Sequence, residues 1–221
     1  MSLVIQNLEK GFNQGEDKVT VLAGLNAEIK QGEVVAIVGQ SGSGKSTLLS
    51  LLAGLDQADK GAILVDGSDL SGMNEKQVTE FRGQNIGIVF QQYHLVSHLT
   101  AVENVMLPME ILGKDEAEAK ATALLKEMGL EHRLNQFPSK MSGGECQRVA
   151  IARALAVQPK ILLADEPSGN LDVHTGDKVM DVFFDAAKKY KITTILVTHS
   201  EALAKRCQRV LRLSEGKLLE A

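Results

Sequence analysis

The sequence predicts an α/β fold with a mostly parallel β-sheet core, an antiparallel β part at the N-terminus and an inserted helical subdomain. Apolar, β-branched runs such as residues 34–38 and 161–164 alternate with helical segments, which is typical of a parallel sheet covered on both faces. Residues 3–12 instead alternate apolar and polar side chains, as a strand with one buried face does. Between about residues 100 and 158 the apolar spacing becomes helical.

The length of 221 residues favours a single domain, 1–221. We expect a core and β subdomain over about 1–91 and 159–221, and the helical subdomain over about 92–158. There is no signal peptide and no apolar run near the ~18–20 residues of a membrane span, so we expect a cytoplasmic protein. If the function involves a membrane, a partner must supply the spanning helices.

Charge and cysteine usage narrow the function classes. The net charge of −4 gives no excess of basic residues, which weighs against a nucleic-acid partner. The two cysteines, Cys146 and Cys207, fall in no metal-ligand or disulfide spacing, so we expect reduced thiols.

The chain begins with an expected edge strand at 3–12, a loop through Lys18, and a β-like stretch from Val19 to Ile29 that Gly24 breaks. Further strands are expected at 34–38, 62–65, 86–90, 161–164 and 193–197, with a hairpin at 210–219. Helices are expected from near Lys45, at 74–83, from a capping box at Thr100, at 115–130, from Ser142 to Pro159, at 175–190 and at 201–206.

The stretch from Gly39 to Thr47 joins a predicted strand to a predicted helix and matches the pattern G-x-x-x-x-G-K-[ST]. Its glycines let successive N–H groups turn inward around a phosphate, and the following helix adds its positive N-terminal dipole. Lys45 would contact the β- and γ-phosphates of a nucleoside triphosphate, and Ser46 would ligate Mg²⁺. A flexible surface loop, the competing interpretation, does not account for the strand–loop–helix context. The expected nucleotide-binding residues are Gly39, Gln40, Ser41, Gly42, Ser43, Gly44, Lys45, Ser46 and Thr47.

Two carboxylates, Asp165 and Glu166, follow the apolar strand at 161–164. The carboxyl ends of parallel strands meet at one edge of a sheet, so we expect these residues beside the phosphate loop. Asp165 suits a Mg²⁺ ligand acting through water, and Glu166 suits the group that polarises the water attacking the γ-phosphate. A pair of solvated turn carboxylates is the alternative.

Weaker signals point to the same edge. Gln91 follows the strand at 86–90 and fits a metal or water ligand, whereas His199 follows the strand at 193–198 and fits a γ-phosphate contact. A polar loop residue and a structural histidine are the respective alternatives. The residues Ser142-Gly143-Gly144-Glu145 open a helix with bare N–H groups, as a second anion site would, or as an ordinary N-cap does.

Together these motifs resemble the ABC-type ATPases, a family of P-loop NTPases. The resemblance covers essentially the whole chain and rests on motifs in the family's order: the phosphate loop at 39–47, Gln91 of the Q-loop, the signature at 141–148, the strand and acidic pair at 161–167, the D-loop at 168–172 and the switch residue His199. Residues 99–105 and 164–172 are also similar to the lipoprotein-releasing and macrolide-exporter branch of that family.

The resemblance implies an ATP-hydrolysing subunit of a membrane transporter or mechanotransmission complex, peripheral on the cytoplasmic face of the membrane, with the permease on a separate chain. Two copies would close head to tail around two ATP molecules. Ser142 and Gly144, with Gly143 and Glu145 beside them, would then contact the partner's ATP, and Asp172 would lie at the seam. Phe12 occupies the position where the family places an aromatic residue, usually Tyr, that stacks on adenine; the alternative is that Phe12 is a core side chain. The segment 92–112 would receive the permease's coupling helix, or packs in the helical subdomain.

Departures from the family pattern leave the reactive groups in place. Met141 and Glu145 replace a common Leu and Gln, Glu being frequent in this branch, and Ser200 stands where an Asp often follows the switch histidine. Cys146 is interpreted as a buried, inert thiol rather than a redox group.

Two other functions compete with the transporter subunit. A regulatory nucleotide-binding module without turnover is disfavoured because Lys45, Asp165, Glu166 and His199 are all present. A soluble ABC ATPase acting on ribosomes or DNA is the other alternative, but the sequence shows no tandem domain, long coiled-coil insertion or basic face.

Overall fold

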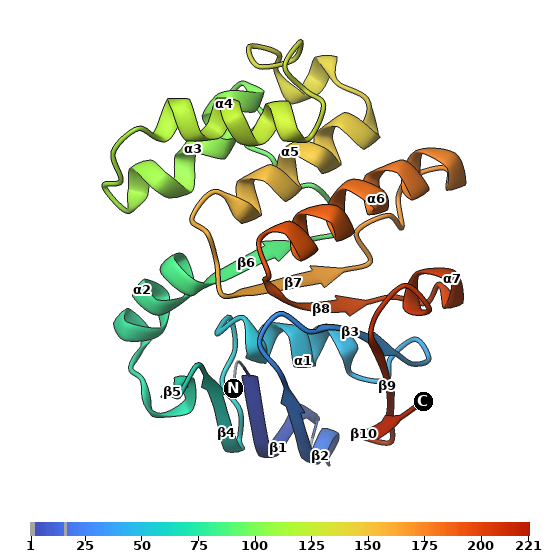
Figure 1. Ribbon diagram of the computed structural model, residues 1–221. Helices are drawn as coiled ribbons and strands as arrows, with labels where there is room; N and C mark the ends of the chain where they lie inside the picture. Colours follow the sequence, from blue (N-terminus) through green and yellow to red (C-terminus); the bar gives the residue numbers. More distant parts are fainter. Residues whose placement is uncertain (1–2, 16) are drawn as a thin grey trace. The chain divides into compact units, whose positions relative to one another are not determined.

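A computed structural model describes residues 3–15 and 17–221. The chain divides into two compact parts, here named unit 1 (Met1–Arg82 with Lys191–Ala221) and unit 2 (Gly83–Tyr190). Figure 1 shows the elements of each unit along the chain. Unit 2 contains all of the predicted helical subdomain at 92–158, together with the elements on either side of it in sequence.

Unit 1 holds the antiparallel sheet. Its strands are β1 (Leu3–Gln14), β2 (Asp17–Ile29), β4 (Lys60–Val65) and β5 (Ser68–Asp69), in the order β2-β1-β4-β5. The prediction that the first strand is an edge strand is wrong, because β1 pairs with β2 on one side and β4 on the other. Alternating apolar residues report one buried face of a strand and carry no information about how many strands flank it.

The first hairpin also differs from the sequence prediction. Gly24 does not break β2: Leu8 pairs with Leu25 and Glu9 with Ala23, so Gly24 is the extra residue of a bulge, with φ of 70°. The loop predicted to run through Lys18 is also wrong, since β2 begins at Asp17. Residue 16, in the predicted loop, lies outside the described residues.

Parallel strands form the second layer of unit 1. The strand β3 (Val34–Val38) lies between β8 (Thr193–Val197) and β9 (Arg209–Ser214) and runs parallel to both. The strand β10 (Lys217–Glu220) closes the C-terminal hairpin with β9. The helical elements of this part of the chain are α1 (Lys45–Leu52), η1 (Leu70–Gly72), α7 (Glu201–Ala204) and α2 (Glu75–Asn85), the last ending in unit 2.

Unit 2 pairs two parallel strands, β6 (Ile86–Val89) and β7 (Ile161–Asp165). Its helical elements are α3 (Ala101–Ile111), α4 (Ala117–Glu127), η2 (Pro138–Lys140), α5 (Gly143–Leu155) and α6 (Val173–Lys189). The helix α5 packs against α3, α4, α6 and β6 (Figure 1), which explains why most of its residues are buried. The predicted helices of this segment are therefore confirmed, with α4 shorter than the predicted 115–130 and α5 ending at Leu155, before the predicted Pro159.

Asn104 fixes the segment before α3. This side chain is fully buried, its Oδ1 accepts the N–H of Val96 at 2.8 Å, and its Nδ2 donates to three carbonyl oxygens, those of Val96, Leu99 and Thr100, at 3.0–3.1 Å. The predicted capping box is also present, because the carboxylate of Glu103 accepts the N–H of Thr100. These contacts support the packing interpretation for the part of segment 92–112 that precedes α3.

No helix in the described ranges, 3–15 and 17–221, is long and apolar enough to span a bilayer.

Candidate nucleotide-binding site

The loop from Gly39 to Gly44 leads from β3 into α1, as predicted. Gly44 is the N-cap of α1 with φ of 98°, a left-handed conformation that side-chain-bearing residues rarely adopt. A Cβ at this position would also lie 2.7 Å from Cγ1 of Val21. The loop can therefore close tightly at the helix N-terminus only with glycine there.

Lys45 points back into its own loop. Its Nζ donates to the carbonyl oxygens of Gly39 at 2.9 Å and Gln40 at 2.8 Å. The hydroxyl oxygen of Ser43 is buried and has no hydrogen-bond partner among the described residues, a costly arrangement that a phosphate oxygen would relieve. A held ammonium and an unpaired donor in one glycine loop form a cradle that fits a phosphate group.

His199 comes off the same edge of unit 1 as the glycine loop. In the parallel register of β3 and β8, Ile37 lies opposite Val197, and the N–H of Thr198 donates to the carbonyl of Ile37. His199 is exposed immediately beyond this pair.

Phe12 lies on β1 with 46% of its side chain exposed, so the alternative of a core phenylalanine is wrong. The ammonium of Lys10 sits 5.2 Å from the centre of its ring and also pairs with the carboxylate of Asp56 at 2.8 Å. An exposed aromatic face is what stacking on a nucleobase requires.

In unit 2, the carboxyl ends of β6 and β7 bring a second group together. Val89 lies opposite Ala164, so Gln91 and the pair Asp165 and Glu166 leave the strands at the same edge. Glu166 has φ of 47°, a left-handed backbone that is strained for a glutamate and recurs at functional sites.

The signature residues form the N-terminus of α5. The hydroxyl of Ser142 accepts the N–H of Glu145, and the Glu145 carboxylate accepts the N–H of Ser142 at 2.8 Å and a bond from Arg133 Nε at 2.8 Å. Burial raises the pKa of Glu145, but the hydrogen bonds from Ser142 and Arg133 outweigh it and hold that pKa below its usual range. The N-cap interpretation is therefore confirmed, and the cap fixes the first turn of the helix in place.

Gly143 and Gly144 let other elements approach this turn. A Cβ on Gly143 would lie 2.6 Å from the Tyr93 hydroxyl, and a Cβ on Gly144 would lie 2.4 Å from Cγ2 of Thr175 on α6. Asp172 caps α6 by accepting the N–H of Thr175. The signature turn thus packs against the start of α6.

Gln91 makes two hydrogen bonds with Asn170 of the D-loop, and the sequence did not predict them. Gln91 Nε2 donates to Asn170 Oδ1 at 3.0 Å, and Asn170 Nδ2 donates to the main-chain oxygen of Gln91 at 3.1 Å. The guanidinium of Arg153 on α5 donates to two carbonyls a little further along the chain, those of Tyr93 and His94. The only sequence signal for the contact between Gln91 and Asn170 is an asparagine in a short polar turn. Such turns are too common to identify a partner.

Cys146 is buried within α5. Burial raises its pKa, and the neighbouring charge of Glu145 raises it further, so the thiol stays protonated near neutral pH. This agrees with an inert structural thiol.

The family model of the ABC transporter matches residues 22–169, more than half of the chain. The chain belongs to the ABC transporter family. The match spans the glycine loop, Gln91, the signature turn and the acidic pair. ABC cassettes bind and hydrolyse ATP, so this chain is an ATP-binding ATPase.

Curated relatives place the chain within a branch of this ABC family. It is 46% identical over 218 residues to an uncharacterised ABC transporter ATP-binding protein, YbbA of Escherichia coli K12, with 98% of this chain and 96% of that protein covered. It is 45% identical over 219 residues to the lipoprotein-releasing system ATP-binding protein LolD of Geobacter metallireducens, covering 98% and 97%, and 47% identical over 218 residues to LolD of Legionella pneumophila, covering 98% and 96%. The branch resemblance seen in the sequence is confirmed, and nothing in these relatives favours a soluble ATPase acting on ribosomes or DNA.

A solved ABC cassette has the same fold. The dimeric post-hydrolysis structure of MJ0796 with ADP and Pi matches with a TM-score of 0.89 and 38% identity, covering 98% of this chain and 96% of the other. The predicted α/β ABC ATPase fold is therefore confirmed.

The predicted Mg²⁺ donors are the Ser46 hydroxyl, the Gln91 amide oxygen and the Asp165 carboxylate. All are oxygen donors of the kind Mg²⁺ prefers, and one carboxylate leaves room for phosphate and water ligands. Residues 3–15 and 17–221 contain no cluster of three or more His, Cys, Asp or Glu that could hold a metal ion by itself. The donor chemistry fits the cation.

Proposed function

We propose that two copies of this chain close head to tail around two ATP molecules and that this closure energises a separate membrane permease. The observation that carries the proposal is the phosphate cradle: the ammonium of Lys45 held by two loop carbonyls beside the unpaired Ser43 hydroxyl. When ATP binds, Lys45 exchanges those carbonyls for β- and γ-phosphate oxygens, and Phe12 stacks on adenine.

Hydrolysis uses the groups at the carboxyl ends of the parallel strands. Glu166 orients and deprotonates the attacking water, and His199 contacts the γ-phosphate. Ser46, Gln91 and Asp165 hold Mg²⁺, which when bound neutralises charge on the phosphates. Such electrostatic stabilisation supplies most of the catalysis in phosphoryl transfer.

The signature turn completes the site of the partner copy. Gly143 and Gly144 present the main-chain N–H groups at the start of α5 to the partner's γ-phosphate, and Ser142 contacts it through its hydroxyl. Glu145 acts through the cap rather than by direct contact, because its carboxylate already accepts bonds from the Ser142 N–H and from Arg133. Asp172 lies at the seam between the copies.

A complementation experiment tests the shared site. Lys45→Ala removes the cradle of one copy, and Ser142→Arg blocks the signature of the other while leaving its own ATP binding nearly unchanged. Each variant alone has no ATPase activity. Mixed together, they form one intact site from the Ser142→Arg cradle and the Lys45→Ala signature, so activity returns.

The control is a chain carrying both substitutions, mixed with wild type. Both sites of that mixed dimer are damaged, so only the wild-type pairs that remain in the mixture hydrolyse ATP. Sites built within single chains would instead give no activity from the two single variants, and every wild-type chain of the control mixture would stay active, including those paired with a damaged chain.

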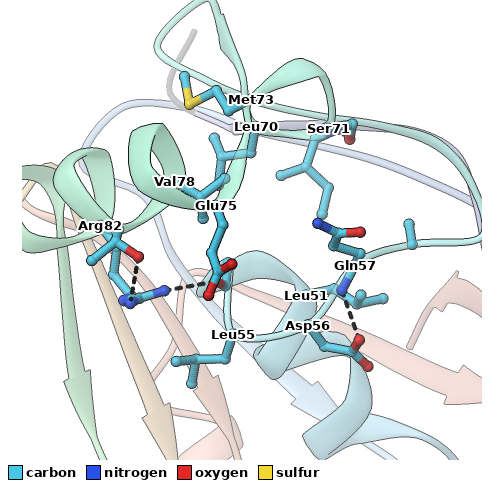
Figure 2. A pocket seen from close by; sticks show the side chains of 14 residues that line it. Leu51, Leu55, Asp56, Gln57, Leu70, Ser71, Met73, Glu75, Val78 and Arg82 are labelled. Atoms are coloured by element: carbon cyan, nitrogen blue, oxygen red, sulfur yellow. Dashed lines mark hydrogen bonds between the residues drawn. The ribbon is translucent and has the colours of Figure 1, made fainter.

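A pocket in unit 1 is the site we propose for the permease's cytoplasmic segment. It has a volume of about 650 Å³, and Figure 2 shows that α2 lines it with Glu75, Val78 and Arg82. The end of α1 and the connection after it contribute Leu51, Leu55 and Asp56. Arg82 donates to the carbonyl of Gly54 at 2.7 Å, which fixes this wall, and Leu55 is 53% exposed. Apolar surface bordered by charges of both signs suits a short amphipathic helix.

Substitutions in the pocket test the docking proposal. Leu55→Glu and Val78→Glu place charge on its apolar surface, so co-purification of a membrane partner should fall strongly while ATP affinity stays unchanged. Leu219→Glu is the matched control, because Leu219 is 55% exposed on β10 and lies outside the pocket. Undiminished capture by both pocket variants would refute the docking site.

The permease would hold the chain at the cytoplasmic face of the membrane. No nucleic-acid partner is proposed, in keeping with the net charge of −4.

A further inference from the structure

Asn170 and Gln91 form a reciprocal contact between the D-loop and the Q-loop within one chain. Gln91 Nε2 lies 3.0 Å from Asn170 Oδ1, and Asn170 Nδ2 lies 3.1 Å from the main-chain oxygen of Gln91. Both residues belong to unit 2. The contact therefore involves one folded part of the molecule.

The main-chain oxygen settles which way both amides point. A carbonyl can only accept, so Asn170 must turn its NH₂ group toward it and its oxygen toward the Gln91 side chain. Gln91 must then offer its own NH₂ group to Asn170. Its Oε1, the one atom of the amide that can bind a cation, is turned away from the D-loop as a result.

Gly169 gives independent support. A Cβ on Gly169 would lie 2.9 Å from Nε2 and 3.2 Å from Cδ of Gln91, so the amide rests directly on the glycine. The N–H of Gly169 in turn donates to the carbonyl of Glu166, at 2.9 Å. The turn that positions Gln91 is thus anchored on the residue proposed to activate water.

We propose that Asn170 is a positioning residue that holds the NH₂ group of the Gln91 amide and so keeps Oε1 available as a ligand for Mg²⁺. This inference rests on the proposed function, in which Gln91 is a Mg²⁺ ligand. Without Asn170, the amide of Gln91 can rotate and present its NH₂ group to the cation. The partial positive charge of that group repels the cation. Partners that orient a metal ligand typically contribute about 10–100-fold to metal affinity.

The test measures how much Mg²⁺ strengthens ATP binding. In a Glu166→Gln background, where ATP persists, the dissociation constant of ATP is measured in EDTA and in Mg²⁺, and their ratio is the metal gain. Asn170→Leu should lower the metal gain about tenfold and leave the constant in EDTA unchanged. Gly169→Ala should act in the same direction by displacing the amide. Asn135→Leu, an exposed asparagine of the same unit, is the control and should change neither value.

Combining variants separates positioning from general damage. Gln91→Ala should lower the metal gain, and adding Asn170→Leu to it should lower the gain no further. If Asn170→Leu lowers the metal gain equally in the presence and in the absence of Gln91, the inference is overturned. It is also overturned if Gln91→Ala lowers the metal gain but neither Asn170→Leu nor Gly169→Ala changes it. An unchanged gain in Gln91→Ala would instead overturn the proposed metal role of Gln91, and the inference with it.

Discussion

Lys45 and Ser43 show how single residues prepare the glycine loop for a phosphate. The loop carbonyls hold the ammonium of Lys45 in place, so little side-chain entropy is lost when ATP binds. The buried Ser43 hydroxyl lacks a partner among the described residues. In the proposed function a phosphate oxygen would supply that partner, so binding would remove the cost of an unsatisfied buried hydroxyl as well as adding contacts.

Glu166→Gln tests the chemical step at the residue scale. The amide cannot take a proton from water, so hydrolysis should fall by at least about 10²–10⁴-fold, while ATP binding is retained and a closed dimer accumulates. Single-turnover measurements with light scattering follow both effects. If Glu166→Gln hydrolyses ATP at the wild-type rate, Glu166 does not activate the attacking water.

Phe12→Ala tests the proposed adenine contact. Loss of the ring removes a stacking interaction of about 0.5–1.5 kcal/mol, so the ATP dissociation constant should rise about threefold to tenfold. Phe12→Tyr keeps the aromatic face and serves as the control. An unchanged constant in Phe12→Ala would place adenine elsewhere.

Glu145→Gln tests the charge at the signature turn through pH. The pKa of Glu145 is depressed in the folded protein, so its ionised form stabilises the fold above the ordinary value of 4.5, and this stabilisation is lost as pH falls through the folded pKa. The variant should be about 1 kcal/mol less stable than wild type at pH 7. Urea unfolding at pH 7, 5 and 3.5 should show the gap narrowing below pH 4.5. A gap of constant size would argue against a role for the charge.

At the scale of elements, Asn104 ties the segment before α3 to that helix through buried hydrogen bonds. Asn104→Ala leaves buried main-chain groups unpaired, so the free energy of unfolding should fall by about 3 kcal/mol and proteolysis near residues 93–100 should speed up. The exposed Asn135→Ala is the control. Equal stability of the two variants would show that water replaces the lost bonds.

Some elements could be predicted because their signals are local. The glycine loop, the capping box at Thr100, the N-cap at Ser142 and the acidic pair after β7 each have a signal that lies within a few residues of sequence. Strand neighbours cannot be read this way: β1 lies between β2 and β4, although its alternation alone looks the same in an edge strand.

Side-chain contacts between residues far apart in the chain could not be predicted from the sequence either. Asn170 lies 79 residues from Gln91, and neither residue carries a pattern that points to the other. Arg153 binds carbonyls 59 and 60 residues away, an unusual role for a charged side chain on a mostly buried helix. Such contacts follow from the tertiary fold, which brings D-loop, Q-loop and α5 together within unit 2.

At the scale of the whole molecule, the proposed function joins an ATPase to a permease on a separate chain. In that proposal, ATP closes two copies, hydrolysis opens them, and the permease responds to the change. Two of the relatives are named lipoprotein-releasing system ATP-binding proteins, and the permease proposed for this chain would determine its cargo.

Affinity capture from detergent-solubilised membranes tests this central claim most directly. The Glu166→Gln variant is used with ATP so that the closed state persists, and the same variant without nucleotide is the comparison. The account predicts that one polytopic membrane protein co-purifies in stoichiometric amount and that Leu55→Glu releases it. Recovery of ribosomal or DNA-associated proteins with no membrane protein would contradict the account.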